Sequence, residues 1–213
     1  MDRISRGGVI IQSWRKAMKA VRVCAVLALG AVSMGGCTPD WAKGSGDVVL
    51  LMTAINDGSP LDSDVAISNG GVCPDLVSVR LENHFKNPAV TTTGFINDFT
   101  VERYEVHYIR SDGRNVEGVD VPYSITGNVA QEVINSSDAE LKIEVVRRQA
   151  KLEPPLRNLV NAQVGSGALV LTAFADITLH ARTTTGVVLN PVSGRLQIDF
   201  ANFGDTLTSC PTQ

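Results

Sequence analysis

The sequence has few aromatic residues, no apolar run long enough to cross a bilayer, and no surplus of positive charge beyond its N-terminal segment. Aromatic residues make up 5% of the 213 residues, which disfavours a platform that stacks sugar rings. The longest apolar stretch, residues 23–36, falls short of the roughly 18 to 20 residues of a membrane-spanning helix. Residues 37–213 hold 13 basic and 21 acidic residues, so we expect no nucleic-acid partner.

The short motifs of common metal sites and hydrolases are also missing. His84, His107 and His180 lie far apart, without His-x-His or HExxH spacing, so isolated histidines on separate strands are expected rather than a zinc site. The acidic loop at residues 56–64 lacks the closing glutamate of an EF-hand, and residues 165–167 (GSG) lack the G-x-S-x-G spacing of a nucleophile elbow. We therefore predict no metal, no cofactor and no catalytic residue.

What the chain does have is a three-part N-terminal pattern over residues 1–36. Six basic residues precede the apolar run VCAVLALGAV, and small residues follow it. This order of basic, apolar and small residues is typical of a secretory signal peptide that is removed on export. Met18 opens the compact basic segment MKAVR, and we hypothesise that translation starts there.

The apolar run is followed by Met34-Gly35-Gly36-Cys37. This segment resembles the lipobox of bacterial lipoproteins, in which an apolar residue and two small residues precede the lipid-bearing cysteine. Met34 replaces the more usual leucine. The resemblance implies that Cys37 carries two or three acyl chains, which anchor a protein stably, and that residues 37–47 form a lipidated tether. Thr38 stands where aspartate would favour inner-membrane retention, so the outer membrane is expected. A plain secreted protein and an uncleaved signal anchor are the alternatives.

Two cysteines remain beyond the signal peptide and the lipobox. Cys24 is lost with the signal and Cys37 is used for lipid, which leaves Cys73 and Cys210. Outside the cytoplasm an isolated pair of cysteines is expected to be oxidised. We predict a Cys73–Cys210 disulfide that joins the loop before the second strand to the C-terminal tail.

Alternation of apolar and polar residues dominates residues 48–213. Leu169 to Arg182 is the clearest case, because period two sustained over that length cannot belong to a helix. The pattern predicts one β-sandwich, immunoglobulin-like or jelly-roll, of seven to eight strands, with a closed barrel as the alternative. The predicted strands are 47–56 (covered on both faces), 76–85, 99–111 (with Glu102 and Tyr104 on one face), 119–125 (an edge), 139–148, 169–182 and 196–200.

Three further predictions concern single segments. Residues 151–160 (KLEPPLRNLV) have helical spacing and predict one short helix between two strands. Ser111 to Asn115 predicts a hairpin loop that presents polar groups. On a regular strand Glu102 and Glu105 fall on opposite faces, which argues against a paired-carboxylate active site.

Together these features favour a membrane-anchored domain that binds or scaffolds and is not an enzyme. The expected partners are the membrane, reached through the lipid, and an envelope protein or polysaccharide contacted through loops. The alternative is an envelope hydrolase with a dispersed active site, since sandwich folds host both kinds of function.

Overall fold

The structure is a computed structural model that describes residues 47–67, 71–87, 89, 95–134, 137–160, 170–203 and 209–210. The predicted signal peptide, Cys37 and nearly all of the predicted tether lie outside these residues. Within the described residues, no helix is long and apolar enough to cross a membrane.

The described residues form eight strands, within the predicted range of seven to eight. The strands are β1 (Val48–Ile55), β2 (Leu61–Asp64), β3 (Asp75–Phe85), β4 (Phe99–Ile109), β5 (Ile125–Val133), β6 (Asp138–Val146), β7 (Leu171–Thr183) and β8 (Val192–Ala201). Two short helical segments, α2 (Arg148–Leu152) and η5 (Leu156–Leu159), connect β6 to β7.

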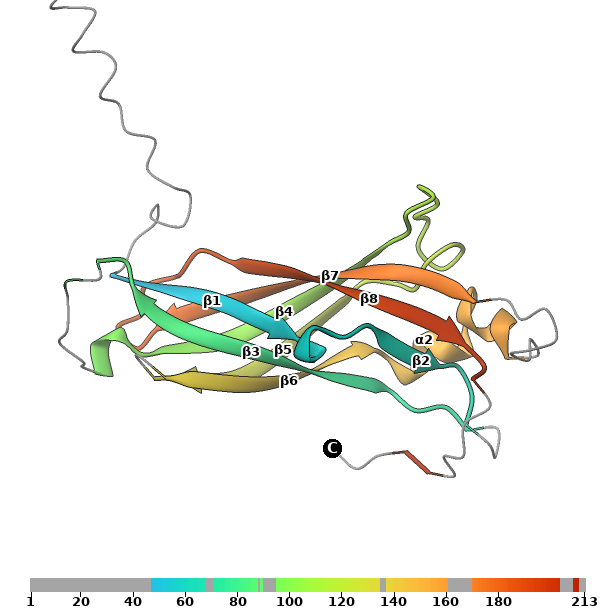
Figure 1. The fold of residues 1–213 in the computed structure, drawn as a ribbon, viewed down its shortest axis with the longest axis horizontal. Coiled ribbons are helices and arrows are strands. Elements are labelled where there is room, and N and C mark those ends of the chain that lie inside the picture. Colours follow the sequence, from blue (N-terminus) through green and yellow to red (C-terminus); the bar gives the residue numbers. More distant parts are fainter. Residues whose placement is uncertain are drawn as a thin grey trace, which may run out of the picture. The chain divides into compact units, whose positions relative to one another are not determined.

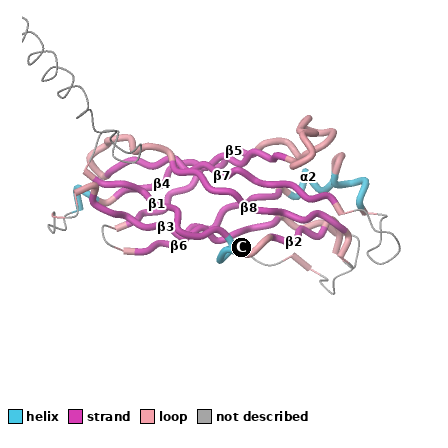
Figure 2. The backbone as a smooth tube through the Cα atoms, turned by 45° about the horizontal axis from the view of Figure 1, so that its top comes forward, coloured by secondary structure: helices cyan, strands magenta, loops and turns pink. Residues whose placement is uncertain are grey.

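The strands build two packed sheets (Figures 1 and 2). One sheet has the order β1-β3-β6 and the other β2-β8-β7-β4-β5. All neighbours pair antiparallel except β2 and β8, which are parallel. The predicted β-sandwich is therefore confirmed. One sheet holds the first, second and fifth of the long strands, and the other sheet holds the remaining long strands together with β2.

The core lies between the two sheets and is made by the inward residues of each strand. The predicted inward face of β3 is confirmed, since Val77, Val79 and Leu81 are all buried. The alternate residues of β7 from Leu171 to Ala181 are buried as well. Both strands lie between two neighbours in their sheets, which leaves them no edge open to solvent.

The sandwich has a proximal and a distal end. At the proximal end β1 begins, β3 and β5 end, and Val48 pairs with Phe85. At the distal end β4 ends, β5 begins and β6 ends. The connection between β4 and β5 projects from the distal end, in yellow-green in Figure 1.

A strand replaces part of the acidic loop expected at residues 56–64. The chain leaves β1 through the short turn η3 (Asn56–Gly58) and enters β2, which belongs to the other sheet. Asn56, Asp57 and Gly58 have positive φ angles, and the Asn56 amide donates to the carbonyls of Ser59 and Pro60. The pattern could not predict β2, because Leu-Asp-Ser-Asp has no apolar alternation and pairs through its backbone.

A bulge in β4 makes the predicted face of Glu102 wrong. The pairing register shifts between Val101 and Arg103 on both sides of the strand. Glu102 and Arg103 are consequently both exposed, whereas Val101 and Tyr104 are both buried. The extra residue reverses the alternation, so Glu102 and Glu105 lie on the same outer face and not on opposite ones.

Three other boundaries differ from the prediction. The edge strand β5 starts at Ile125, where the predicted strand 119–125 ends. Strand β8 starts at Val192, four residues before the predicted strand 196–200. The outer face of β1 is not covered, since Leu51 is 37% exposed.

The predicted helix is present but is divided into two pieces. α2 starts at Arg148, before the predicted range, and η5 follows the pair Pro154-Pro155. Proline lacks a donor N–H and disfavours helical geometry in the preceding residue, so one continuous helix cannot form. Leu156 and Leu159 are buried as the spacing requires, whereas Leu152 is exposed.

Candidate binding surface at the distal end

The connection between β4 and β5, residues 110–124, contains the hairpin turn that the sequence predicts. Gly113 adopts a positive φ of 79° and its N–H donates to the Arg110 carbonyl. The Asn115 side-chain oxygen accepts a hydrogen bond from the Arg110 N–H at 2.7 Å. Turn formation by Asp112 to Asn115 is therefore confirmed.

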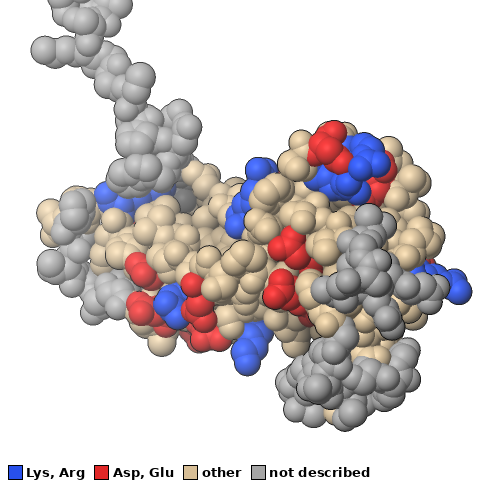
Figure 3. All heavy atoms as spheres, turned by 45° about the vertical axis from the view of Figure 1, so that its right-hand side comes forward, with Lys and Arg blue, Asp and Glu red and all other residues tan. Residues whose placement is uncertain are grey.

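Two arginines hold the tip of this loop through one carboxylate. The Asp112 carboxylate accepts hydrogen bonds from Arg110 at 3.2 and 2.7 Å and from Arg114 at 2.9 and 2.7 Å. Hydrogen bonding from Arg114, with a smaller contribution from Arg110, lowers the pKa of Asp112 from its ordinary value to about 2. Figure 3 shows basic and acidic atoms gathered at this end of the molecule. The tip is fixed although it lies in solvent.

The second half of the loop is ordered by its own backbone. The Val116 carbonyl accepts hydrogen bonds from the N–H groups of Val119, Asp120 and Val121. Gly118 has a positive φ of 73°, and the Tyr123 ring lies so close that a Cβ atom there would stand 2.4 Å from the tyrosine oxygen. Only glycine satisfies both conditions, so this position fixes where the Tyr123 ring lies.

A side-chain network fastens the loop to β4. His107 Nδ1 lies 2.8 Å from Ser124 Oγ, and the Ser124 hydroxyl donates to the Glu117 carboxylate. The Ser124 N–H donates to the same carboxylate at 3.2 Å. Val121, which is fully buried, fixes the loop from the inside.

This ordered loop exposes large apolar side chains. Val116, Val119 and Tyr123 are 60%, 65% and 59% exposed. Beside them a hollow of about 560 Å³ is bordered by Tyr123, Arg147 and Glu153. We call Val116, Val119, Tyr123 and this hollow the distal surface. Apolar groups held exposed by a rigid scaffold are typical of a binding surface.

The polar groups of the hollow come from the start of the β6–β7 connection. Arg147 donates to the Thr126 carbonyl at 3.1 Å, and Gln149 donates to Glu153 at 2.8 Å. A few positioned polar groups among apolar ones are what gives a pocket its specificity.

The His107–Ser124 pair does not have the arrangement of a serine hydrolase. A hydroxyl has one proton, and that of Ser124 is donated to Glu117. His107 Nδ1 must then donate to the serine oxygen and cannot act as its base. The network explains the rigidity of the loop without catalysis.

The three histidines lie on three strands, as predicted. His84 on β3 contacts Glu82 at 2.7 Å, while His107 and His180 approach Glu105 at 3.9 and 3.3 Å from β4 and β7. In the described ranges, no group of three or more His, Cys, Asp or Glu side chains is placed to hold a metal ion. Residues 165–167 (GSG) lie outside the described residues.

In the acidic loop at residues 56–64, two of the carboxylates have partners within the protein. Asp57 pairs with Arg80 at 3.0 Å, and Asp64 accepts a hydrogen bond from the Ala66 N–H at 3.2 Å. These contacts attach the loop to the protein and do not direct its oxygens to a common point.

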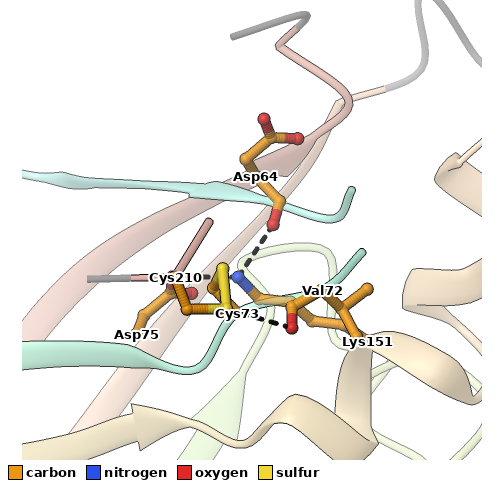
Figure 4. Close-up of a disulfide and its surroundings, with 6 residues drawn as sticks. All are labelled: Asp64, Val72, Cys73, Asp75, Lys151 and Cys210. Carbon is orange, nitrogen blue, oxygen red and sulfur yellow. Dashed lines mark hydrogen bonds and ion pairs between the residues drawn. A yellow bond between two sulfur atoms is a disulfide. The ribbon is translucent and has the colours of Figure 1, made fainter. Parts of the chain in front are cut away.

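The predicted Cys73–Cys210 disulfide is confirmed and lies beside a buried ion pair (Figure 4). Lys151 on α2 is 1% exposed, and its ammonium donates to Asp75 at 2.9 Å and to the Asp64 carbonyl at 2.8 Å. Ser63 donates to the other Asp75 oxygen at 2.5 Å. Burial raises the pKa of Asp75 above its ordinary value, although Lys151 and Ser63 act in the opposite direction. This cluster fixes α2 to β2 and β3.

Neither this buried cluster nor the second half of the loop was predicted from the sequence. In the sequence, nothing distinguishes Lys151 from a solvent-exposed lysine, and only the fold brings its side chain to Asp75. Comparison with models of known protein families gives no match, and comparison with curated proteins gives none. The chemistry of the distal surface therefore carries the functional interpretation.

Proposed function

We propose that the protein is a bacterial envelope lipoprotein that binds a partner protein through its distal surface. In this proposal residues 1–36 are removed, Cys37 carries lipid, and residues 37–47 tether the domain to a membrane, the outer membrane of a diderm cell. The lipobox resemblance supports the anchor, and the distal surface supports the binding role.

The observation that carries the binding role is the ordered exposure of Val116, Val119 and Tyr123. Solvated loops usually present polar residues, because an exposed apolar side chain gains nothing from water. Here one loop holds three such side chains through the Asp112 and Ser124 networks. A pre-ordered surface loses little conformational entropy on binding.

The position of this surface suits a tethered protein. The described domain starts at Asp47, whose carbonyl accepts the Lys86 N–H at the proximal end. The distal surface is at the opposite end of the strands, so a partner could reach it while the N-terminus is held.

A protein partner is favoured over a polysaccharide by the chemistry of the surface. Two of its three exposed apolar side chains are valines, which offer no ring face for a sugar. Aliphatic side chains around one tyrosine match the apolar centre of a protein interface. A hydrolase is not favoured, because the Ser124 proton is held by Glu117.

Site-specific photo-crosslinking in cells tests the binding role. We expect a photoreactive residue at Val119 to form a discrete adduct with an envelope protein, and one at Lys142, which is exposed on β6, to form none. Tyr123→Ser should reduce the adduct at position 119. Val188→Ser changes a valine that is 61% exposed elsewhere and should leave the adduct intact. Equal adducts from positions 119 and 142, or an adduct indifferent to Tyr123→Ser, would contradict the proposal.

The anchor has its own test. Cys37→Ser should leave the precursor without lipid and abolish its membrane association. A Cys37→Ser protein that reaches the same mass as the wild type and stays in the membrane fraction would show that the lipoprotein assignment is wrong.

A further inference from the structure

The proximal end of the sandwich also exposes large apolar side chains. Phe95 and Ile96 belong to the single turn η4 (Phe95–Asn97) before β4, and Ile134 follows β5. They are 74%, 51% and 57% exposed. We call these three residues the proximal apolar patch. No hydrogen-bonded loop comparable to residues 110–124 is described around them in the parts of the chain that the structure covers.

Asn83 brings these segments together. Its buried amide donates to the Asn97 carbonyl at 2.9 Å and to the Val133 carbonyl at 3.3 Å. Asn83 is also paired with Leu50 near the start of β1. The patch therefore lies at the end of the sandwich where the chain enters its first strand.

The length of the segment before β1 limits what can cover the patch. Nine residues, Thr38 to Gly46, separate Cys37 from Asp47. The ten steps from Cys37 to Asp47, fully extended at about 3.3 to 3.6 Å each, span about 33 to 36 Å at most. A lipid on Cys37 would therefore keep the proximal end within reach of the bilayer surface.

We propose that the proximal apolar patch docks onto the lipid bilayer and orients the domain with its distal surface away from the membrane. This inference rests on the proposed lipid anchor. Apolar side chains at an interface enter the boundary between headgroups and acyl chains. Exposed Glu132 and Asp138 flank Ile134, so the insertion is shallow and the charges remain among the headgroups.

The charge of the protein indicates which lipids it meets. Residues 37–213 carry eight more acidic than basic residues, so an anionic membrane surface repels them. Docking therefore depends on apolar contact with zwitterionic lipid and on the tether, which keeps the local concentration high.

Tryptophan quenching by brominated lipid tests this orientation. The full-length protein is expressed in bacteria, and its mature lipidated form is placed in phosphatidylcholine vesicles with or without bromine on the acyl chains. Phe95→Trp and Val119→Trp are compared in a Trp41→Phe background. Both positions are well exposed, at 74% and 65%, so either should accept tryptophan without unfolding.

We expect Phe95→Trp to lose most of its emission in brominated vesicles and Val119→Trp to lose none. If both variants float with the vesicles and neither or both are quenched, the docking proposal is wrong while the anchor stands. If neither variant floats with the vesicles, the anchor is wrong and the docking proposal falls with it.

Discussion

The two ends of the sandwich both expose apolar side chains, but they hold them differently. At the distal end a disulfide, the buried Lys151–Asp75 pair and the Asp112 network fix the surroundings of the exposed residues. At the proximal end the Asn83 amide and the pairing of Phe99 with Val133 join the two exposed segments, and the described residues there include no disulfide and no buried ion pair. A protein partner needs a surface of fixed shape, whereas a fluid bilayer adapts to whatever is inserted. The difference in bracing therefore matches the two partners proposed for the two ends.

The strongest test of the distal bracing is Lys151→Met. The substitution leaves Asp75 buried without its cation, which should lower the free energy of unfolding by about 3 to 5 kcal/mol. Urea unfolding measures this loss, and Lys142→Met on the exposed face of β6 should stay within about 0.5 kcal/mol of wild type.

The loss in Lys151→Met should depend on pH in a defined direction. The folded pKa of Asp75 is raised above the ordinary 3.8, and removing Lys151 raises it further. A group with a raised folded pKa favours folding at low pH and loses that contribution as pH rises through the folded value. The deficit should therefore shrink as pH falls from neutrality toward 3.8, and a constant deficit would contradict the ion pair.

Removing the disulfide by Cys73→Ser with Cys210→Ser should have the next largest effect. The bond joins residues separated by 137 positions, and its loss should cost about 2 to 5 kcal/mol. Urea unfolding of the wild type with and without reductant should show the same difference. If reductant has no effect on the wild type, the bond does not contribute to stability.

Asn83→Ala should weaken the proximal end alone. It leaves the Asn97 and Val133 carbonyls without their donor, at a cost of about 1 to 3 kcal/mol. Hydrogen exchange should become faster in residues 95–99 and remain unchanged in residues 110–124. Asn128→Ala, on the exposed face of β5, is the matched control, and faster exchange at both ends would remove the distinction between them.

The smallest effect is expected at Asp112, which lies exposed at the tip of the loop. Its pKa is lowered to about 2, so it contributes stability above pH 3.8 that is lost as pH falls toward 2. Carboxyl titration followed by NMR should give a midpoint near 2, and Arg114→Ala should move it back toward 3.8. A midpoint near 3.8 in the wild type would show that the loop tip is not held by its arginines.

Long strands with apolar inward faces could be predicted from the sequence, and strands that pair mainly through backbone could not. β3 and β7 follow their alternation because every second residue enters the core. β2 is almost entirely polar, and β5 places Gly127, Val129 and Gln131 at its inward positions, so neither has an apolar pattern. In β4 the bulge at Glu102 and Arg103 adds a residue that period two cannot anticipate.

In the loop that carries the distal surface, only the turn could be predicted from the sequence. Ser111 to Asn115 has turn chemistry, whereas the alternation of Val119 and Val121 imitates a strand. In the structure Val119 is exposed and Val121 buried, because the backbone folds around the Val116 carbonyl. The Lys151–Asp75 pair joins residues 76 positions apart, and no local sequence pattern predicts such a contact.

The chain passes from β1 through η3 to β2, which lies in the other sheet, and this path determines how the domain responds to a pulling force. A force applied between Asp47 and the distal loop runs along the strands, so it shears the β1–β3 ladder lengthwise. All seven residue pairs of that ladder then bear the load together instead of opening one after another. After β1 had slipped from β3, β2 would still be paired with β8 in the other sheet. A domain with this topology resists a force applied at Asp47 better than its free energy of unfolding alone would indicate. The reason is that forced unfolding is governed by the unfolding rate.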